Sequence, residues 1–312
     1  MQRAAVFCHS GLGDGVISLI LSNNLKLNGF SVDTFHNTMV LLQNWFPHLP
    51  ILPYPSIDEI ESLFHRYDLF FIFHNRSNPF ILKLVEEGKR RFGERVKVIY
   101  IYPSKNIVNE PYYLDAQTNP SITIAENLRR FCEKILRLPK ISRGNGCIPA
   151  PELQHRAHPQ RVILHPAGAR ISKNWPKERF LSLAQKLKNR GYQVLWALTA
   201  EERTNWSELT QEDFSPLDGT LDNLARTIYE SGFFIGNDSG PGHLASSLGI
   251  PTITIARRKA YSKFWAPDFT KGIAVTPSSL IPNIRGLRLR DLYWKYFISV
   301  RKVVRAFEAL TL

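Results

Sequence analysis

The run from Phe233 to Ala245 constrains the fold of this chain more than any other segment. An apolar strand stops at a Gly-Asn-Asp-Ser-Gly turn, and Pro241 and Gly242 then open a helix. The small residues let the backbone approach a ligand, and the free amides at the start of the helix attract phosphate oxygens. Ser239 and His243 add side-chain donors. The run therefore predicts an α/β fold with an anion site that suits a nucleotide diphosphate.

The same run also has a purely structural interpretation. A helix that begins here needs a cap, and Asp238 or Ser239 can supply one by bonding its free amides, while His243 packs against the sheet. Both interpretations share the strand–turn–helix geometry, and they differ in whether the turn holds a ligand.

Strand and helix patterns alternate along the whole chain. Apolar runs predict strands at residues 4–7, 31–35, 68–73, 96–101, 161–165, 193–198, 233–236 and 252–256. Helical patterns occupy residues 14–28, 57–65, 79–87, 121–138, 176–190, 221–231, 242–248 and 289–310, with Ser121 as the expected cap of the fourth. This alternation is typical of parallel sheets covered by helices on both faces.

The length of the chain favours two domains. Its 312 residues are long for one core, and two domains of roughly 150 residues are the natural expectation. Between residues 139 and 160 the periodicity is lost, and four prolines and two glycines predict a linker. We therefore expect α/β domains with doubly wound parallel sheets at residues 1–155 and 156–288.

Charge and cysteine usage limit the partners and the compartment. The net charge of +13 indicates an anionic partner, which can be nucleic acid, a membrane surface or a phosphorylated substrate. No nucleic-acid module accompanies the basic clusters, so we expect no nucleic-acid partner. No apolar run approaches the roughly 20 residues of a membrane span. The three cysteines lie far apart without CxxC spacing, so we expect a cytoplasmic protein.

A glycine-rich loop at residues 9–15 follows the first strand and opens a helix. Its spacing departs from the GxGxxG dinucleotide fingerprint because Val16 stands where the last glycine belongs, and it contains no Walker A lysine. The loop places Asp14 at a helix start, where a carboxylate is either stabilised by the dipole or acts as a general base. Ser10 and Gly13 are candidates for acceptor or phosphate contacts.

Basic residues follow two strands of the second half. Arg170 and Lys173 lie in the loop 165–176, and Arg257 and Arg258 follow the strand that ends at residue 256. Since ligands of open α/β sheets bind beyond the carboxyl ends of the strands, each of these cations can neutralise phosphate. Taken singly, an exposed loop cation is more often plain surface.

Carboxylates give a weaker signal in the second half. Glu201 and Glu202 follow the strand 193–198 and can bind a ribose or sugar hydroxyl, although helix-start carboxylates of this kind are commonly surface residues. No Asp-x-Asp pair is present, and His155 and His158 have no cysteine or carboxylate partners. We therefore expect neither a metal nor another cofactor.

Three blocks, taken in order, resemble glycosyltransferase family nine, the heptosyltransferases of lipopolysaccharide core synthesis. The first block is Gly11-Leu12-Gly13-Asp14, and the second runs from His165-Pro166 to Lys173-Asn174-Trp175-Pro176. The third combines Asp238-Ser239-Gly240, His243-Leu244-Ala245 and Gly249-Ile250-Pro251-Thr252. Together the blocks span most of the chain.

The resemblance implies a GT-B fold, in which two Rossmann-like domains face a cleft. The first domain would bind the acceptor and the second the nucleotide-sugar, and the terminal helix, residues 289–312, would pack back on the first domain. The acceptor would be the lipopolysaccharide core or another phosphorylated glycolipid or glycan. The basic surface agrees with such an acceptor and with peripheral association at the cytoplasmic face of the inner membrane.

The resemblance also implies an inverting, metal-independent transfer from ADP-heptose. Asp14 matches the general base and Lys173 a phosphate-binding lysine, while the donor-binding turn comprises Asp238, Ser239, Gly240 and His243. To these we add Gly242, Arg170 and Glu201 as expected donor contacts.

Two alternatives differ in chemistry. Where the family commonly has a Gly-Pro pair, this chain has Ala256-Arg257-Arg258-Lys259, which leaves the sugar and the base open. One alternative is a GT-B enzyme that uses another nucleotide-sugar, and the other is a non-catalytic binder of nucleotides or glycolipids, since a fold does not fix its chemistry.

Overall fold

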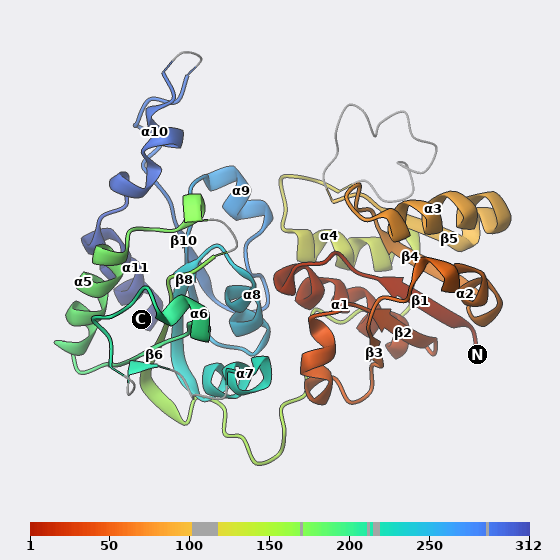
Figure 1. Ribbon diagram of the computed structural model, residues 1–312, viewed down its shortest axis with the longest axis horizontal. Helices are drawn as coiled ribbons and strands as arrows, with labels where there is room; N and C mark the ends of the chain where they lie inside the picture. The colour runs from red at the N-terminus through yellow and green to blue at the C-terminus, as the bar shows by residue number, and fades with distance from the viewer. Residues whose placement is uncertain (102–117, 169–170, 211–212, 215–218, 285–286) are drawn as a thin grey trace. The chain divides into compact units, whose positions relative to one another are not determined.

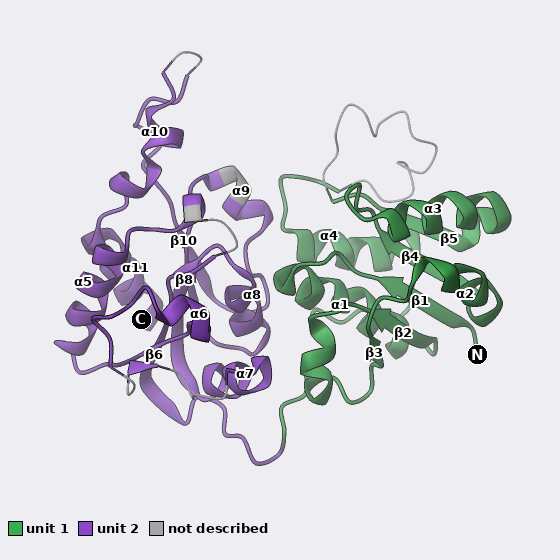
Figure 2. Ribbon diagram, in the orientation of Figure 1, with its two compact units in different colours: residues 1–150 green, residues 151–312 purple. Residues whose placement is uncertain are grey.

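Two separate parallel sheets organise the chain, and each forms its own unit. The computed structural model describes residues 1–101, 118–168, 171–210, 213–214, 219–284 and 287–312 (Figure 1). Residues 1–150 form the first unit and residues 151–312 the second (Figure 2). The division falls inside the predicted linker and precedes the predicted boundary by five residues. Within the described ranges, no helix combines the length and apolar character needed to cross a bilayer.

The first unit has a five-stranded sheet in the order β3-β2-β1-β4-β5. All its neighbouring strands are parallel: β1 (Arg3–Phe7), β2 (Ser31–Phe35), β3 (Ile51–Leu52), β4 (Leu69–Phe73) and β5 (Val96–Ile99). The helices are α1 (Leu12–Leu27), α2 (Ile60–Arg66), α3 (Pro79–Phe92) and α4 (Ile124–Arg130), with the 3-10 helices η1 (Met39–Trp45), η2 (Ile57–Glu59) and η3 (Gly93–Arg95). The π-helical turn η5 (Phe131–Ile135) continues α4.

The apolar strands of this unit are buried from both sides, which is why they read as continuous apolar runs. Ala4 to Phe7 of β1 are fully buried, and the ring of Phe7 stacks on Phe35 of β2 with centroids 4.5 Å apart. The fourth predicted helix starts later than expected, because Thr123 and not Ser121 accepts the hydrogen bond from the Glu126 amide.

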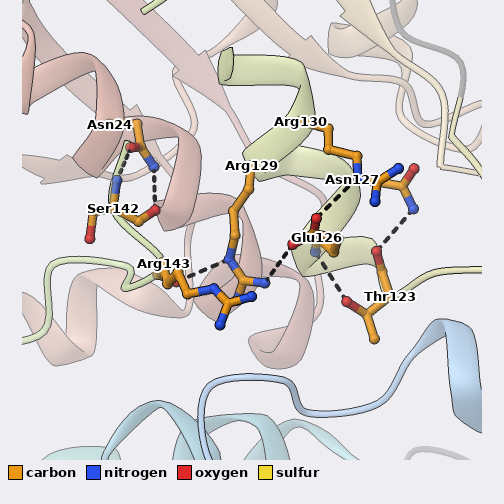
Figure 3. Close-up of polar contacts among 8 residues, drawn as sticks. All are labelled: Asn24, Thr123, Glu126, Asn127, Arg129, Arg130, Ser142 and Arg143. Carbon is orange, nitrogen blue, oxygen red and sulfur yellow. Dashed lines mark hydrogen bonds and ion pairs between the residues drawn. The ribbon is translucent and has the colours of Figure 1, made fainter. Parts of the chain in front are cut away.

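The start of the predicted linker is bound along α1 by asparagine side chains. We call residues 140–145 the strap. Asn28 pairs with both backbone groups of Lys140, at 2.7 and 3.0 Å, and Asn24 with both groups of Ser142, at 3.1 and 2.7 Å. Figure 3 shows the pairing of Asn24 with Ser142, and it shows Arg129 of α4 reaching the Arg143 carbonyl. These residues are therefore part of the first unit.

The second unit repeats the plan with a sheet in the order β10-β9-β8-β6-β7. Its parallel strands are β6 (His158–His165), β7 (Gln193–Trp196), β8 (Ser231–Asn237), β9 (Thr252–Ile255) and β10 (Gly272–Val275). The α-helices are α5 (Lys177–Lys188), α6 (Ala200–Arg203), α7 (Leu221–Tyr229), α8 (Gly240–Ser247), α9 (Lys259–Phe264), α10 (Leu289–Leu292) and α11 (Val300–Thr311), with the 3-10 helices η6 (Ile171–Lys173) and η8 (Trp294–Phe297).

The C-terminal segment differs from its prediction in two ways. The expected continuous helix is interrupted, because Ser299 has extended backbone and caps a new helix, α11, by accepting from the Lys302 amide at 3.2 Å. The apolar face of α11, including Val303 and Phe307, lies in the core of the second unit, and α11 packs on α5, β9 and β10. The helix therefore belongs to the second unit, whereas the prediction grouped it with the first; its packing on the first unit stays a prediction.

The strap leads to a prediction about stability. Asn24→Ala leaves both backbone groups of Ser142 without their partner, which should cost about 2 kcal/mol of unfolding free energy. Thermal unfolding should show a lower midpoint, and trypsin should cut faster after Lys140 and Arg143. Asn205→Ala is the exposed control and should change neither. Equal cleavage of wild type and Asn24→Ala would contradict the role of the strap.

Candidate functional site

Each sheet has one point where the winding reverses, and the candidate residues gather there. In the second unit β6 leads to β7 on one side, whereas β8, β9 and β10 follow on the other side. The loops after β6 and β8 therefore diverge and leave the opening where ligands bind in open α/β sheets. In the first unit the reversal lies between β1 and β4, and the loop after β1 leads to Asp14.

Asn237, the last residue of β8, joins the two loops at the reversal of the second unit. Its Oδ1 accepts the amide of Trp175 at 3.0 Å, and its Nδ2 donates to the Pro166 carbonyl at 2.5 Å. Asn237 is 1% exposed. One side chain thus holds both ends of the loop that contains Lys173 and Asn174.

Close packing beneath this joint requires a glycine. A Cβ at Gly236 would lie 2.9 Å from the His165 carbonyl oxygen, so a larger residue would push β8 away from β6. His165 itself is buried, and its Nδ1 lies 2.8 Å from the Ala197 carbonyl oxygen, to which it must donate. Burial lowers the pKa of His165, so the ring is neutral and its Nε2 is an acceptor.

The turn after β8 has unused hydrogen-bonding capacity. Ser239 occupies the N-cap position of α8, yet its side chain makes no capping bond, and its buried Oγ has no hydrogen-bond partner among the described residues. Asn174 Oδ1, in the loop held by Asn237, is likewise buried and without a described partner. A serine that only caps its helix would bond an amide. For Ser239, the cap interpretation therefore fails.

The remaining donor candidates fall into different surroundings. Gly240 and Gly242 lie in the first turn of α8, after the partly buried Asp238, and His243 is buried on the same helix. Lys173 is exposed at the end of η6. Arg170 lies outside the described residues.

Glu201 and Glu202 both lie in the first turn of α6. Glu202 closes a capping box with Thr199, whose amide donates to the carboxylate at 2.8 Å. Glu202 therefore has a structural role as a helix cap, and Glu201 lies exposed beside it.

The two arginines after β9, Arg257 and Arg258, contact the buried carboxylate of Asp291. Arg258 Nε donates to Asp291 Oδ1 at 3.0 Å, and its Nη2 also contacts Oδ2, while Arg257 Nη2 is 3.7 Å from Oδ2. Arg288 makes a third contact at 3.0 Å. The hydrogen bond from Arg258 holds the pKa of Asp291 well below its usual range. One carboxylate faces three arginines here, so the cluster keeps a net positive charge, while Asp291 holds Arg258 in place; the role of Arg258 as a phosphate contact stays a prediction.

In the first unit, Asp14 lies in the first turn of α1 with its carboxylate folded over Gly11. A Cβ at position 11 would come within 2.4 Å of Asp14 Oδ2, so this arrangement requires glycine. Gly11 provides no side-chain cap, and His9 Nδ1 lies 3.5 Å from Asp14 Oδ2. The Asp14 side chain is 21% exposed, beside the exposed Ser10 and the partly buried Gly13. A solvent-accessible carboxylate at a helix start can accept a proton from a hydroxyl.

A buried histidine fixes the turn that carries Asp14. His36 Nδ1 accepts the amides of Thr38 and Met39, both at 3.1 Å, so the ring proton resides on Nε2. Nε2 then donates to the Gly11 carbonyl at 3.0 Å. A Cβ at Gly15 would lie 2.7 Å from this nitrogen. The roles of His36 and Asn237 are not evident from the sequence, since both side chains bind loops that are distant along the chain.

The described residues contain no group of three or more His, Cys, Asp or Glu side chains that could hold a metal ion. The expectation of metal-independent chemistry remains a prediction.

The fold is that of the GT-B glycosyltransferases. The chain superposes on E. coli heptosyltransferase WaaC with ADP at a TM-score of 0.68, over 99% of both chains and with 15% identity. It superposes on the glycosyl transferase family 9 protein from Veillonella parvula at a TM-score of 0.69, over 99% of this chain and 97% of that one, with 16% identity. At such identities the likeness concerns the fold, and it confirms the fold predicted from the sequence.

One family model matches part of the sequence. Residues 122–268 match the model of glycosyltransferase family 9 (heptosyltransferase). Lipopolysaccharide heptosyltransferase 3 of E. coli K12 is 28% identical over 114 residues, which cover 34% of this chain and 33% of that relative. The alignment thus spans about a third of the curated relative. The matched region contains the second and third of the three blocks and not Asp14, so this part of the chain resembles glycosyltransferase family 9, in agreement with the resemblance seen in the sequence.

The buried imidazole of His36 leads to a prediction about pH. Burial is the largest influence on His36 and lowers its pKa. Above about pH 6.5, where the unfolded histidine is also neutral, the full stability is present. Between about pH 6.5 and the lowered pKa of His36 in the folded state, the unfolded chain binds more protons than the folded one. The free energy of unfolding therefore falls as the pH falls through this range.

Denaturant titrations from pH 8 to pH 5 measure this slope. His36→Gln should be less stable at pH 8 and should show a smaller loss toward pH 5, with the burial of His165 and His48 responsible for the remaining slope. The exposed His65→Gln is the control and should keep the wild-type slope. An unchanged slope in His36→Gln would contradict the neutral, buried state of this ring.

Proposed function

We propose that this protein is an inverting glycosyltransferase that moves a heptose, or a related sugar, from an ADP-sugar to a lipopolysaccharide-core or other phosphorylated glycan acceptor. The observation that carries the proposal is the unpartnered pair of buried oxygens, Ser239 Oγ and Asn174 Oδ1, in the two loops joined by Asn237. Buried polar atoms without partners are costly in a folded protein, and a bound ligand removes that cost. Two similar proteins support the sugar: one is E. coli heptosyltransferase WaaC with ADP, and the other is lipopolysaccharide heptosyltransferase 3 of E. coli K12.

The diphosphate of the donor is proposed to bind at the start of α8. Backbone amides in the first helical turn and the Ser239 hydroxyl would donate to phosphate oxygens, and Lys173 would add a positive charge. Asn174 and Glu201 can hydrogen-bond donor hydroxyl groups. Because these donors stabilise the negative charge of the departing diphosphate, the reaction is proposed to need no metal.

Asp14 is proposed as the general base. Its carboxylate would take the proton of the acceptor hydroxyl as that oxygen attacks the anomeric carbon. The bond between this carbon and the diphosphate oxygen breaks at the same time, so the configuration inverts and the nucleoside diphosphate leaves. His36, by holding Gly11, would fix the direction of the carboxylate. We propose a cytoplasmic location, where nucleotide-sugars are available.

A panel of ADP-, UDP-, GDP- and CMP-linked sugars tests the donor by thermal shift. A bound donor stabilises the fold, by about 2.7 kcal/mol at a concentration of 100 times its dissociation constant. ADP-sugars should shift unfolding most. Ser239→Ala should weaken that binding about tenfold, because one charge-assisted hydrogen bond is lost. Ser247→Ala, on the same helix, is the matched control. A shift by UDP-sugars alone would overturn the ADP-sugar donor.

Substitution of Asp14 tests the base. Asp14→Asn should lower turnover by about 10² to 10⁴, which is the usual contribution of a general base, while donor affinity changes little. The control is Asp58→Asn, an exposed carboxylate of the same unit. If Asp14→Asn turns over at the wild-type rate, Asp14 is not the base; if the wild type binds donors but transfers no sugar to any acceptor, the protein is a binder.

A further inference from the structure

Exposed apolar side chains concentrate in one segment of the second unit. Of the sixteen large apolar side chains that are exposed among the described residues, seven lie between residues 280 and 297, and the others are scattered. The seven are Leu280, Ile284, Leu287, Leu292, Tyr293, Tyr296 and Phe297. We call residues 279–284 together with 287–297 the apolar arm. Clusters of this kind on a folded surface mark interaction sites, whereas single exposed residues do not.

The two segments of the arm, residues 279–284 and 287–297, are hydrogen-bonded to each other, so the exposed side chains belong to one ordered element. Ile284 and Leu287 exchange backbone hydrogen bonds at 3.1 and 3.0 Å in an antiparallel bridge. Further along, the Arg290 amide donates to the Pro282 carbonyl and the Asp291 amide to Asn283 Oδ1, both at 3.2 Å. Figure 1 shows α10 standing out from the body of the second unit.

The base of the arm is fixed in the core. Trp294 and Ile298 are buried in the main apolar cluster, and the indole Nε1 of Trp175 donates to the Ile298 carbonyl at 2.9 Å. Arg179 of α5 donates to the carbonyls of Lys295 and Tyr296, at 2.9 and 3.1 Å. The exposed aromatic residues of the arm therefore lie next to residues that are fixed in the core of the second unit.

The charge of the arm is positive. Arg288, Arg290 and Lys295 lie between or beside the exposed apolar residues. The one carboxylate of the described arm, Asp291, is buried and compensated by Arg258 and Arg288. A partner of this surface must accept aliphatic and tyrosine side chains and must carry negative charge.

We propose that the apolar arm docks the protein on an anionic lipid bilayer. Leu280, Ile284 and Leu292 would enter the boundary between headgroups and acyl chains, and Tyr293 and Tyr296 would lie at headgroup level, where tyrosine is favoured. The basic side chains attract anionic headgroups. A second copy of the chain would bring the same positive charges together, so charge complementarity favours lipid over self-association. The proposal is independent of the transfer reaction.

Flotation with vesicles tests the proposal. The full chain is mixed with phosphatidylcholine vesicles that contain about one third phosphatidylglycerol, and with pure phosphatidylcholine vesicles. We expect the chain to bind the anionic vesicles, and this binding should weaken when salt is added. Binding to the neutral vesicles should be weaker than binding to the anionic ones. The triple variant Leu280→Ser/Ile284→Ser/Leu292→Ser should bind at least about tenfold more weakly, because three apolar side chains no longer insert.

The matched control carries the same three changes at exposed leucines of the first unit, Leu27→Ser/Leu41→Ser/Leu82→Ser, and should bind within about twofold of wild type. Thermal unfolding of both variants shows that they are folded. The proposal is overturned if the wild type stays unbound on anionic vesicles, or if both variants bind equally. It is also overturned if the arm variant only converts a dimer to a monomer in sedimentation without vesicles. Donor binding, measured separately, does not depend on these outcomes.

Discussion

The amide side chain of Asn237 holds together the two loops of the candidate site in the second unit. It is the last residue of a buried strand, and it bonds both ends of a loop that begins 71 residues earlier in the chain. These two hydrogen bonds tie both ends of the loop that contains Lys173 and Asn174 to the strand end that precedes Ser239. A buried amide can do this at low cost because both of its polar groups are satisfied, whereas a half-satisfied amide would destabilise the strand end.

In the first unit, the side chain of His36 holds the loop of the candidate site. His36 lies just after β2 and, as a neutral ring, accepts two amides and donates to the Gly11 carbonyl. In both units, then, a buried polar side chain at or just after the end of a strand holds the backbone of a loop of the candidate site. Glycine allows close packing at both places, because Gly15 lies against the His36 ring and Gly236 against the His165 carbonyl oxygen. The exposed side chains that would touch substrates are thus held in position by the buried side chains of Asn237 and His36, which would not touch them.

Much of the fold was predictable because strands buried on both faces are apolar without interruption, and the eight predicted strands correspond to observed ones. The remaining two strands, β3 and β10, were not predicted: β3 has two residues, and β10 is largely exposed. The terminal helix was grouped with the first unit, although its apolar face lies in the core of the second, because an amphipathic pattern shows that a face is buried but not against what. Ser239 and Asp14 were recognisable from their local motifs. Asn237, His36 and the Arg258–Asp291 pair were not, since each depends on contacts between residues 25 or more apart in sequence.

The strap along α1 has a mechanical consequence. The connection between the units leaves the first unit only after its asparagine-bound stretch, which runs from the C-terminal end of α1 toward Asn145 at the Val16 carbonyl. Tension carried by the connecting chain therefore meets the first unit first at Ile148, whose amide donates to the Trp45 carbonyl, and next at the strap along α1. The strap is bound to the same helix that carries Asp14, so a pull that passes Ile148 acts on that helix and not on a loose loop.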